Sequence, residues 1–367
     1  MSTDLDIVRG DQPPDDDRET APAPDAAPAK RKMRGWKKAL IGLGVLLLIL
    51  VVGVTGGGFY LYHRYDHKVS RQDLLPDAAG TGQDDQQREQ NWKSGPLNLL
   101  LLGSDSRATT PGGVSPIGER SDTIMLVHIA KDRKSATIIS IPRDSYVNVP
   151  AGGSWKGGKN KINAAFAFGG AKLAVTTVHQ LTGVPVDGAM IANFASIQEL
   201  VDAVGGVNVC VPYDVRSTFS SKVWKTGCHD MSGDETEEFM RQRYEVPGGD
   251  FGRMYNQQLV VKAVIAKAEK GDLLTNPLKL DDLMSTAAEA LTVDQDLDLQ
   301  KLALAVKGIR VGNITTATVP YTSADLKTRA GTAVQLDMGR ARAMFAAVRN
   351  DTIGQYLRDN PSSPPGN

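Results

Sequence analysis

The sequence contains few of the residues that carry redox, zinc or nucleophilic chemistry. Its 367 residues include two cysteines and five histidines, whose spacing matches no zinc site. It has no G-x-S-x-G elbow, no Walker phosphate loop and no H-E-x-x-H pair. Its 42 basic residues are balanced by 42 acidic residues, so the overall charge indicates no nucleic-acid partner. These features argue against a zinc enzyme, a serine hydrolase, a P-loop nucleotidase and a nucleic-acid-binding protein.

The amino-terminal part of the chain predicts a cytoplasmic tail and a membrane anchor. Residues 1–38 start with an acidic stretch rich in proline and alanine, which we expect to be disordered, and end with a basic cluster. Residues 39–62 carry no charge, and as a helix they would span about 36 Å, which suffices for a tilted membrane crossing. The excess of basic residues before this span predicts a single-pass type II protein with its main part outside the cell.

Two other interpretations of residues 39–62 are a buried core helix and a cleaved signal peptide. A core helix is rarely apolar on every face over this length. A signal peptide has a shorter apolar stretch, a shorter preceding tail and a clear small-residue cleavage site, which this sequence does not offer. We therefore expect an anchor in the cell membrane.

Beyond the span, the sequence predicts a polar linker at 63–96, of which 71–95 is a linker or a short helix, one α/β domain at 97–350 and a short tail at 351–367. The first strands of the domain are nearly continuous apolar runs, such as "LNLLLLGSD" and "TIMLVHIA", which are typical of a sheet covered on both faces. Helical patterns follow at 162–183, 194–206, 233–240, 253–270, 278–291, 298–308 and 338–350. We therefore expect a central mixed β-sheet flanked by helices.

The two cysteines, Cys210 and Cys228, both lie beyond the predicted anchor. In an oxidising compartment we expect them to form one disulfide, which for a loop of this length stabilises the fold by about 3 kcal/mol. The alternative is a pair of unpaired buried thiols.

Charged residues gather at the ends of the predicted strands. Asp105 follows the first strand, Arg120 and Asp122 stand at the start of the second, and Arg143 follows the third. The end of one strand and the start of its antiparallel neighbour share one edge of a sheet, where ligands bind in α/β folds. The two carboxylates could hold Mg²⁺ or Mn²⁺, and the arginines suit a phosphate. The alternative is a set of ordinary surface ion pairs.

A second charged cluster lies in "FMRQRYEVPGGDFGRMYNQQ". The following P-G-G predicts that a helix ends near residue 240, so Arg241 and Arg243 face the same side of an extended segment and could bind one pyrophosphate. Arg253 lies at a predicted helix start, which favours anions, and Gln257 follows one helical turn later. The alternative is a solvated helix end with routine ion pairs.

Six ordered blocks of the sequence resemble the LytR–CpsA–Psr family of membrane-anchored enzymes from Gram-positive cell envelopes. They are "LLLLGSDSR", "ERSDTIMLVHI", "IISIPRDSYV", "KINAAFAFGG", "LTGVPVDGAMIANFASIQELVDAVGGVNV" and "RQRYEVPGGDFGRMYNQQ". The resemblance implies a phosphotransferase that takes a glycopolymer from a polyprenyl-pyrophosphate carrier and attaches it to peptidoglycan through a phosphodiester. It also implies that the lipid lies in an apolar tunnel between the sheet and the helices.

The resemblance assigns roles to the charged residues found above. Asp105 and Asp122 correspond to carboxylates that bind Mg²⁺. Arg120, Arg143, Arg241 and Arg243 correspond to an arginine clamp on the pyrophosphate, with Arg253 and Gln257 nearby. One departure is Asn256, where the family often has an arginine.

The mechanism expected from these roles is an in-line attack by a sugar hydroxyl of peptidoglycan on the phosphorus that bears the polymer. The reaction depends on positioning and charge neutralisation, which the metal ion and arginines would supply. Either Asp105 or Asp122 could also accept the proton of the hydroxyl, although a metal-bound carboxylate is a poor base. Two other functions fit the same residues: a polyprenyl-pyrophosphate pyrophosphatase, and a non-catalytic membrane-anchored protein with an envelope-binding or regulatory role.

Overall fold

A computed structural model of the chain describes residues 68–104, 121–270, 285–286 and 288–361. All of these lie in one compact unit, 58–367. The predicted tail and anchor lie outside the described residues, as do two of the predicted site residues, Asp105 and Arg120. Among the helices that are described, none has the length and apolar character needed to cross a membrane.

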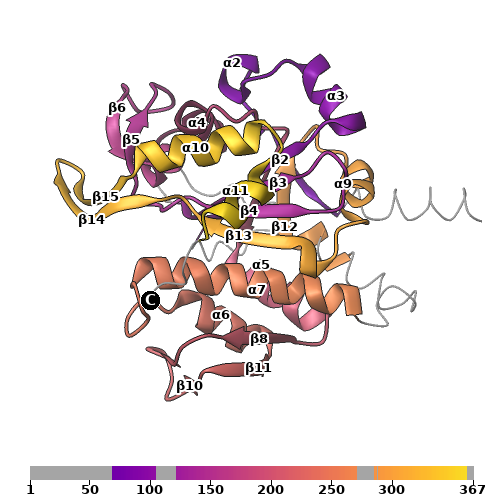
Figure 1. Cartoon of the computed structure of the whole chain (residues 1–367), viewed down its shortest axis with the longest axis vertical. Helices are drawn as coiled ribbons and strands as arrows, with labels where there is room; N and C mark the ends of the chain where they lie inside the picture. The colour runs from indigo at the N-terminus through magenta and orange to yellow at the C-terminus, as the bar shows by residue number, and fades with distance from the viewer. Residues whose placement is uncertain (1–67, 105–120, 271–284, 287, 362–367) are drawn as a thin grey trace, which may run out of the picture. The chain divides into compact units, whose positions relative to one another are not determined.

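A seven-stranded mixed sheet forms the centre of this unit (Figure 1). In the order of the sheet its strands are β1 (Ser70–Gln72), β12 (Leu291–Asp294), β7 (Gly188–Asn193), β2 (Leu97–Ser104), β3 (Ser121–Ile129), β4 (Ala136–Ser140) and β13 (Ile314–Thr318). β2, β3 and β4 pair antiparallel, whereas β2 pairs parallel with β7 and β4 with β13. The predicted α/β fold with a mixed central sheet is therefore confirmed.

Helices and four small sheets surround the central sheet. The helices are α2 (Ala78–Thr81), α3 (Asp85–Ser94), α4 (Asn163–Thr182), α5 (Phe194–Ala203), α6 (Gly233–Arg241), α7 (Asp250–Lys270), α9 (Leu299–Val306), α10 (Met338–Arg349) and α11 (Ile353–Asp359), with a 3-10 turn at Val311–Asn313. The small sheets pair β5 (Tyr146–Val149) with β6 (Gly158–Lys161), β8 (Val207–Val211) with β11 (Gly227–Met231), β9 (Val215–Arg216) with β10 (Val223–Trp224), and β14 (Tyr321–Thr328) with β15 (Gly331–Leu336).

The apolar run of β2 is buried on both faces of the sheet, as predicted. Leu100 and Leu102 pack in a core cluster with residues of α4 and α10. Leu101 and its partner Met125 face the opposite side, where they pack against residues of α7. Figure 1 shows α4 and α10 on one side of the sheet and α7 on the other. Because successive side chains of a strand alternate between faces, a strand covered by helices on both sides needs an unbroken apolar sequence.

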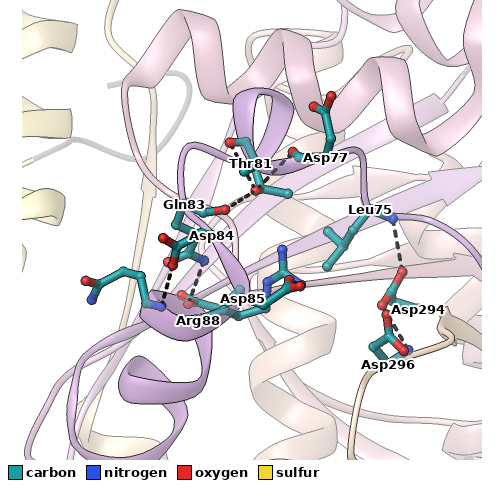
Figure 2. A network of polar contacts seen from close by, with 12 residues as sticks. Leu75, Asp77, Thr81, Gln83, Asp84, Asp85, Arg88, Asp294 and Asp296 are labelled. Atoms are coloured by element: carbon teal, nitrogen blue, oxygen red, sulfur yellow. Dashed lines mark hydrogen bonds and ion pairs between the residues drawn. The ribbon is translucent and has the colours of Figure 1, made fainter.

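The segment predicted to be a linker, 63–96, contributes three elements to the fold. β1 extends the sheet by pairing with β12, and α2 and α3 follow. The buried carboxylate of Asp294 accepts hydrogen bonds from the backbone N–H groups of Leu74 and Leu75 at 2.9 and 3.0 Å, as Figure 2 shows for Leu75. The folded region therefore begins before residue 97, because contacts more than two hundred residues away in the sequence order this polar segment.

Two further segments differ from the sequence prediction. The helix predicted at 278–291 is confirmed for its described residues 285–286 and 288–290, but its last residue, Leu291, begins β12, which pairs with β7 and β1. The rest of that predicted helix lies outside the described residues. The predicted tail at 351–367 contains α11, whose Ile353 and Leu357 are buried in the main core cluster.

The two cysteines form a disulfide between directly opposed residues of β8 and β11. This pair of strands packs beside α7 and α6. The disulfide therefore lies in the same part of the fold as Arg241, the last residue of α6.

Candidate functional site

The antiparallel pairing of β3 with β4 brings two of the predicted site residues together. Asp122 lies at the start of β3, and Arg143 follows the end of the neighbouring β4. The Nη1 atom of Arg143 forms an ion pair with Oδ1 of Asp122. The expectation that strand ends share one charged edge therefore holds for the described residues.

The start of α7 reaches the same edge. Oδ1 of Asp250 lies 2.8 Å from Nη2 of Arg253 and 3.5 Å from Nη2 of Arg143. Arg253 is only 5% exposed, and its Nη2 also lies 3.4 Å from the backbone oxygen of Asp122. Asp250 was not among the residues predicted for the site, yet its carboxylate joins the two arginines.

Three buried donor atoms at this edge have no hydrogen-bond partner among the described residues: Nε of Arg143, Nε of Arg253 and Nε2 of Gln257. We call them the donor cluster. Gln257 uses its other amide atom, because Oε1 accepts a 3.0 Å hydrogen bond from the hydroxyl of Thr123. A buried donor without a partner costs about 1–3 kcal/mol. An anion with several oxygen atoms could accept hydrogen bonds from such donors.

The electrostatics of the site reflect arginines and carboxylates packed close together. Burial alone would lower the pKa of Arg143, but the carboxylates of Asp250 and Asp122 outweigh it and raise the pKa above its ordinary value. Burial lowers the pKa of Arg253, an effect that Asp250 opposes. The like charges of Arg143 and Arg243 add to the lowering. Three guanidinium groups therefore lie close enough to interact, an arrangement suited to a multiply charged phosphate.

The carboxyl end of α6 and the segment after it present Arg241 and Arg243. A capping box starts the helix: the hydroxyl of Ser232 accepts from the Glu235 N–H, while the Glu235 carboxylate accepts from the Ser232 N–H. The helix ends at Arg241, one residue later than predicted, and the extended Gln242 that follows is fully buried. Gln242 was not recognised from the sequence, because its role depends on a loop twenty-four residues away, whose Thr218 donates to its Oε1.

The guanidinium group of Arg241 contacts two aromatic rings. Its Cζ is 5.7 Å from the ring centre of Phe194 and 5.3 Å from that of Phe219. Glu237, one helical turn earlier, binds its Nη1 at 2.9 Å. Together these contacts hold the arginine in place, with the cation–π contacts adding attraction.

A small apolar cavity of about 50 Å³, partly open to solvent, lies beside this edge. It is lined by Leu101, Gly103, Thr123, Met125, Ala192, Asn193, Phe194, Ile197, Met240, Gln257 and Val261, from the sheet and from α5, α6 and α7. At Gly103 an added Cβ would come within 2.6 Å of the Cβ of Thr123, so the strands pack too closely at this wall for a side chain at residue 103. The cavity meets the charged edge at Phe194 and Gln257.

Asn256, the departure noted in the sequence, lies outside the charged edge. Its side chain is fully buried, donates to the Phe239 carbonyl at 3.4 Å and accepts from the Tyr213 hydroxyl at 3.2 Å. It therefore fastens α7 to α6 near the end that carries Arg241. Burial, and less so the neighbouring Tyr255, raises the pKa of the Tyr213 hydroxyl, which keeps it a neutral donor.

The carboxylates at the edge are chemically suited to a hard cation. The described residues contain no group of three or more histidine, cysteine or acidic side chains that could hold a metal ion. Mg²⁺ is usually bound through only one or two carboxylates together with waters and substrate phosphates. Asp122, with Asp105 outside the described residues, fits that pattern.

Comparison with known proteins gives a consistent result. The family described as the LytR_cpsA_psr family matches residues 66–349. The polyisoprenyl-teichoic acid–peptidoglycan teichoic acid transferase TagU of Bacillus cereus is 34% identical over 282 residues, covering 74% of this chain and 83% of that protein. The crystal structure of protein gbs0355 from Streptococcus agalactiae is 26% identical, with a TM-score of 0.59, covering 70% of this chain and 88% of that one. The structure of TagT bound to LIIa-WTA is 25% identical, with a TM-score of 0.54, over 70% of this chain and 91% of that one.

Proposed function

Because the chain belongs to the LytR–CpsA–Psr family, we propose that this phosphotransferase moves a glycopolymer from a polyprenyl-pyrophosphate carrier to peptidoglycan, joining them by a phosphodiester. The observation that carries the proposal is the donor cluster beside the apolar cavity. A ligand with a charged head and an apolar chain satisfies both features at once. The name of the B. cereus relative, a polyisoprenyl-teichoic acid–peptidoglycan transferase, supports the same class of substrates.

The head and the chain of such a carrier would lie in different parts of the site. We assign the pyrophosphate to Arg143, Arg253 and Gln257, which carry the donor cluster, and to Arg241 and Arg243. The first units of the polyprenyl chain would occupy the cavity that Phe194 lines. Arg120, outside the described residues, completes the predicted arginine clamp.

Phosphoryl transfer depends on charge neutralisation more than on covalent catalysis. An acceptor hydroxyl oxygen attacks the phosphorus that bears the glycopolymer, its proton is released, and the bond to the lipid phosphate breaks in line with the attack. The arginines stabilise the negative charge that spreads over the phosphoryl oxygens. The carboxylate of Asp122 is already bound to the guanidinium group of Arg143, so we assign Asp122 to charge placement.

Asp122 and Asp105 would hold the Mg²⁺ or Mn²⁺ ion. When bound, the ion would neutralise charge on the pyrophosphate oxygens and help to orient them. The paired Asp122 carboxylate supports this assignment, since Arg143 already holds its Oδ1 at the edge where the phosphates would lie.

We further propose that residues 39–62 anchor the protein in the cell membrane and that the domain lies outside the cell. The support is the distribution of basic residues around that span and the disulfide of Cys210 with Cys228, a bond typical of oxidising compartments. This location places the site where a membrane-held carrier and peptidoglycan meet.

The test uses the full chain in detergent with a polyprenyl-pyrophosphate-linked saccharide, peptidoglycan fragments and Mg²⁺. Mass spectrometry should detect a phosphodiester-linked product. Arg253→Lys should lower the rate by about 10²–10³-fold, because a lysine loses the Nε donor and the planar geometry. Arg310→Lys, at an exposed arginine of an outlying ion pair, should leave it unchanged.

Two outcomes would replace the proposed function. Release of saccharide phosphate or lipid phosphate without conjugate, on every acceptor offered, would indicate a pyrophosphatase. Tight binding of the carrier with no turnover, and an effect of Arg253→Lys on affinity alone, would indicate a binding protein.

A further inference from the structure

Exposed aromatic rings gather at the arginines of the site. Among the described residues, the exposed large hydrophobic side chains are Phe219, Tyr244, Tyr321, Leu304 and Val306. Phe219 and Tyr244, both 61% exposed, each contact one of the paired arginines. The two aliphatic side chains lie on α9, whose Leu302 packs with Leu97 at the opposite end of β2. We call Phe219 and Tyr244 the aromatic rim.

Phe219 is held in place by a well-defined turn. It lies between β9 and β10, where the hydroxyl of Ser217 accepts hydrogen bonds from the N–H groups of Phe219 and Ser220 at 2.9 and 3.0 Å. The next anchor is Thr218, whose N–H donates to the buried amide of Gln242 at 3.0 Å. The turn that carries the ring is therefore fixed to the residue between the two arginines, and the ring stays exposed although its base is anchored.

Tyr244 is placed by its own neighbour in the chain. Its ring centre lies 4.9 Å from Cζ of Arg243, and its hydroxyl accepts a 3.1 Å hydrogen bond from Nη2 of the same arginine. Each guanidinium of the pair is therefore accompanied by an exposed ring. A site that binds only a phosphate and an alkyl chain does not need exposed aromatic rings beside its arginines.

The order of groups around Arg241 matches the order of groups in the proposed donor. Phe194, which contacts Arg241, is a wall of the apolar cavity. Phe219, which contacts the same guanidinium group, is exposed to solvent. A chain that enters the cavity, with its pyrophosphate on Arg241, therefore continues toward Phe219 with whatever the pyrophosphate carries. In a lipid-linked glycopolymer that next group is a sugar.

We propose that the aromatic rim is a saccharide subsite for the sugar joined directly to the pyrophosphate of the donor, an inference that rests on the proposed function. The C–H-rich face of a pyranose packs on an aromatic ring, whose negative face attracts these weakly positive hydrogens. Phosphate oxygens would accept from the adjacent guanidinium groups. The ligand class is thus a glycosyl pyrophosphate, in which sugar and phosphate bind side by side.

The experiment compares two probes that differ only in the sugar: farnesyl pyrophosphate and the same lipid carrying one N-acetylhexosamine on its pyrophosphate. Binding to the full chain in detergent is measured by calorimetry. We expect the sugar to increase the affinity of the wild type, and Phe219→Leu and Tyr244→Leu each to remove about 5–10-fold of that increase, the range for one aromatic contact. Affinity for farnesyl pyrophosphate itself should not change.

Leu304→Ala is the matched control, because Leu304 is 59% exposed but lies on α9. It should change neither affinity. Equal loss for both probes in the rim variants would mean that the rings only position the arginines, and no loss for either would mean that no sugar binds there. The same titrations are repeated in phosphatidylglycerol nanodiscs. If the rim variants lose affinity for both probes in the nanodiscs but not in detergent, the rings contact lipid. Each of these results overturns the subsite. A wild type that fails to bind farnesyl pyrophosphate at all would instead refute the proposed function.

Discussion

Two adjacent glutamines of α7 are predicted to respond in opposite ways to the same substitution. Nε2 of Gln257 is a buried donor without a partner among the described residues, and its Oε1 holds one hydrogen bond, from Thr123. Gln257→Leu removes an unpaired donor that costs about 1–3 kcal/mol and loses one bond that contributes about 1 kcal/mol. The free energy of unfolding should therefore stay the same or rise by about 1 kcal/mol, while the transfer rate falls by about 10²-fold because the pyrophosphate loses a contact.

Gln258 is the matched control. It is equally buried, but its Nε2 donates to the Ser140 hydroxyl at 2.7 Å and to the Ala317 carbonyl at 3.0 Å. Gln258→Leu removes both bonds and leaves a buried carbonyl and hydroxyl on two sheet strands without that partner. We expect a loss of about 2–4 kcal/mol, a fall in melting temperature of about 5–10 °C, and a nearly unchanged rate per folded molecule.

Thermal unfolding of the full chain, followed by circular dichroism, and the transfer assay on the same samples check this pair of expectations. A clear destabilisation by Gln257→Leu would show that its amide is satisfied in the free protein and would refute the role of the donor cluster. An unchanged transfer rate in that variant would remove Gln257 from the pyrophosphate site.

Three other changes test separate parts of the account. Asp122→Asn should lower the transfer rate by about 10²–10³-fold at saturating Mg²⁺, and titration of the rate with Mg²⁺ should show that the variant needs a higher Mg²⁺ concentration than the wild type to reach half of its maximal rate. His128 is buried, and burial outweighs its bond to a carboxylate, so its pKa lies below the ordinary value of about 6.5. As the pH falls below about 6.5, the unfolded state binds the proton before the folded state does, so the free energy of unfolding decreases. His128→Gln should make the free energy of unfolding depend less on pH in this range, as measured by urea unfolding at pH 6.5 and pH 5. Replacing Cys210 and Cys228 together by serine should lower the free energy of unfolding by about 3 kcal/mol, and reduction of the wild type should reproduce it.

Several features of the fold could be predicted because the responsible contacts are local. The apolar run of residues 97–102 predicts a strand covered on both faces, and the helix that ends at Gly183 has this glycine at φ 64°, a left-handed conformation that suits glycine. The end of α6 was placed within one residue from the P-G-G that follows. The juxtaposition of Asp122 with Arg143 followed from strand order alone, since antiparallel neighbours share an edge.

Other features were missed because they depend on partners far away in the sequence. The polar segment 70–94 has little apolar periodicity, and it folds because buried carboxylates bind it. Asp294 accepts from the backbone at Leu74 and Leu75, and Asp187 accepts from Gln83, Asn91 and the Asn98 N–H. Such contacts form only after the sheet has brought the two segments together, so no local pattern announces them.

The sequence by itself determined the family, the mixed α/β architecture and the types of charged residues available, because strand periodicity, helix ends and ordered motifs are read from neighbouring residues. The tertiary structure decided which of those residues meet. Asp250 joins Arg143 to Arg253, and Asn256 braces the helices. Whether a buried donor finds a partner depends on the packing of several elements around it. For the donor cluster, we propose that a ligand supplies those partners.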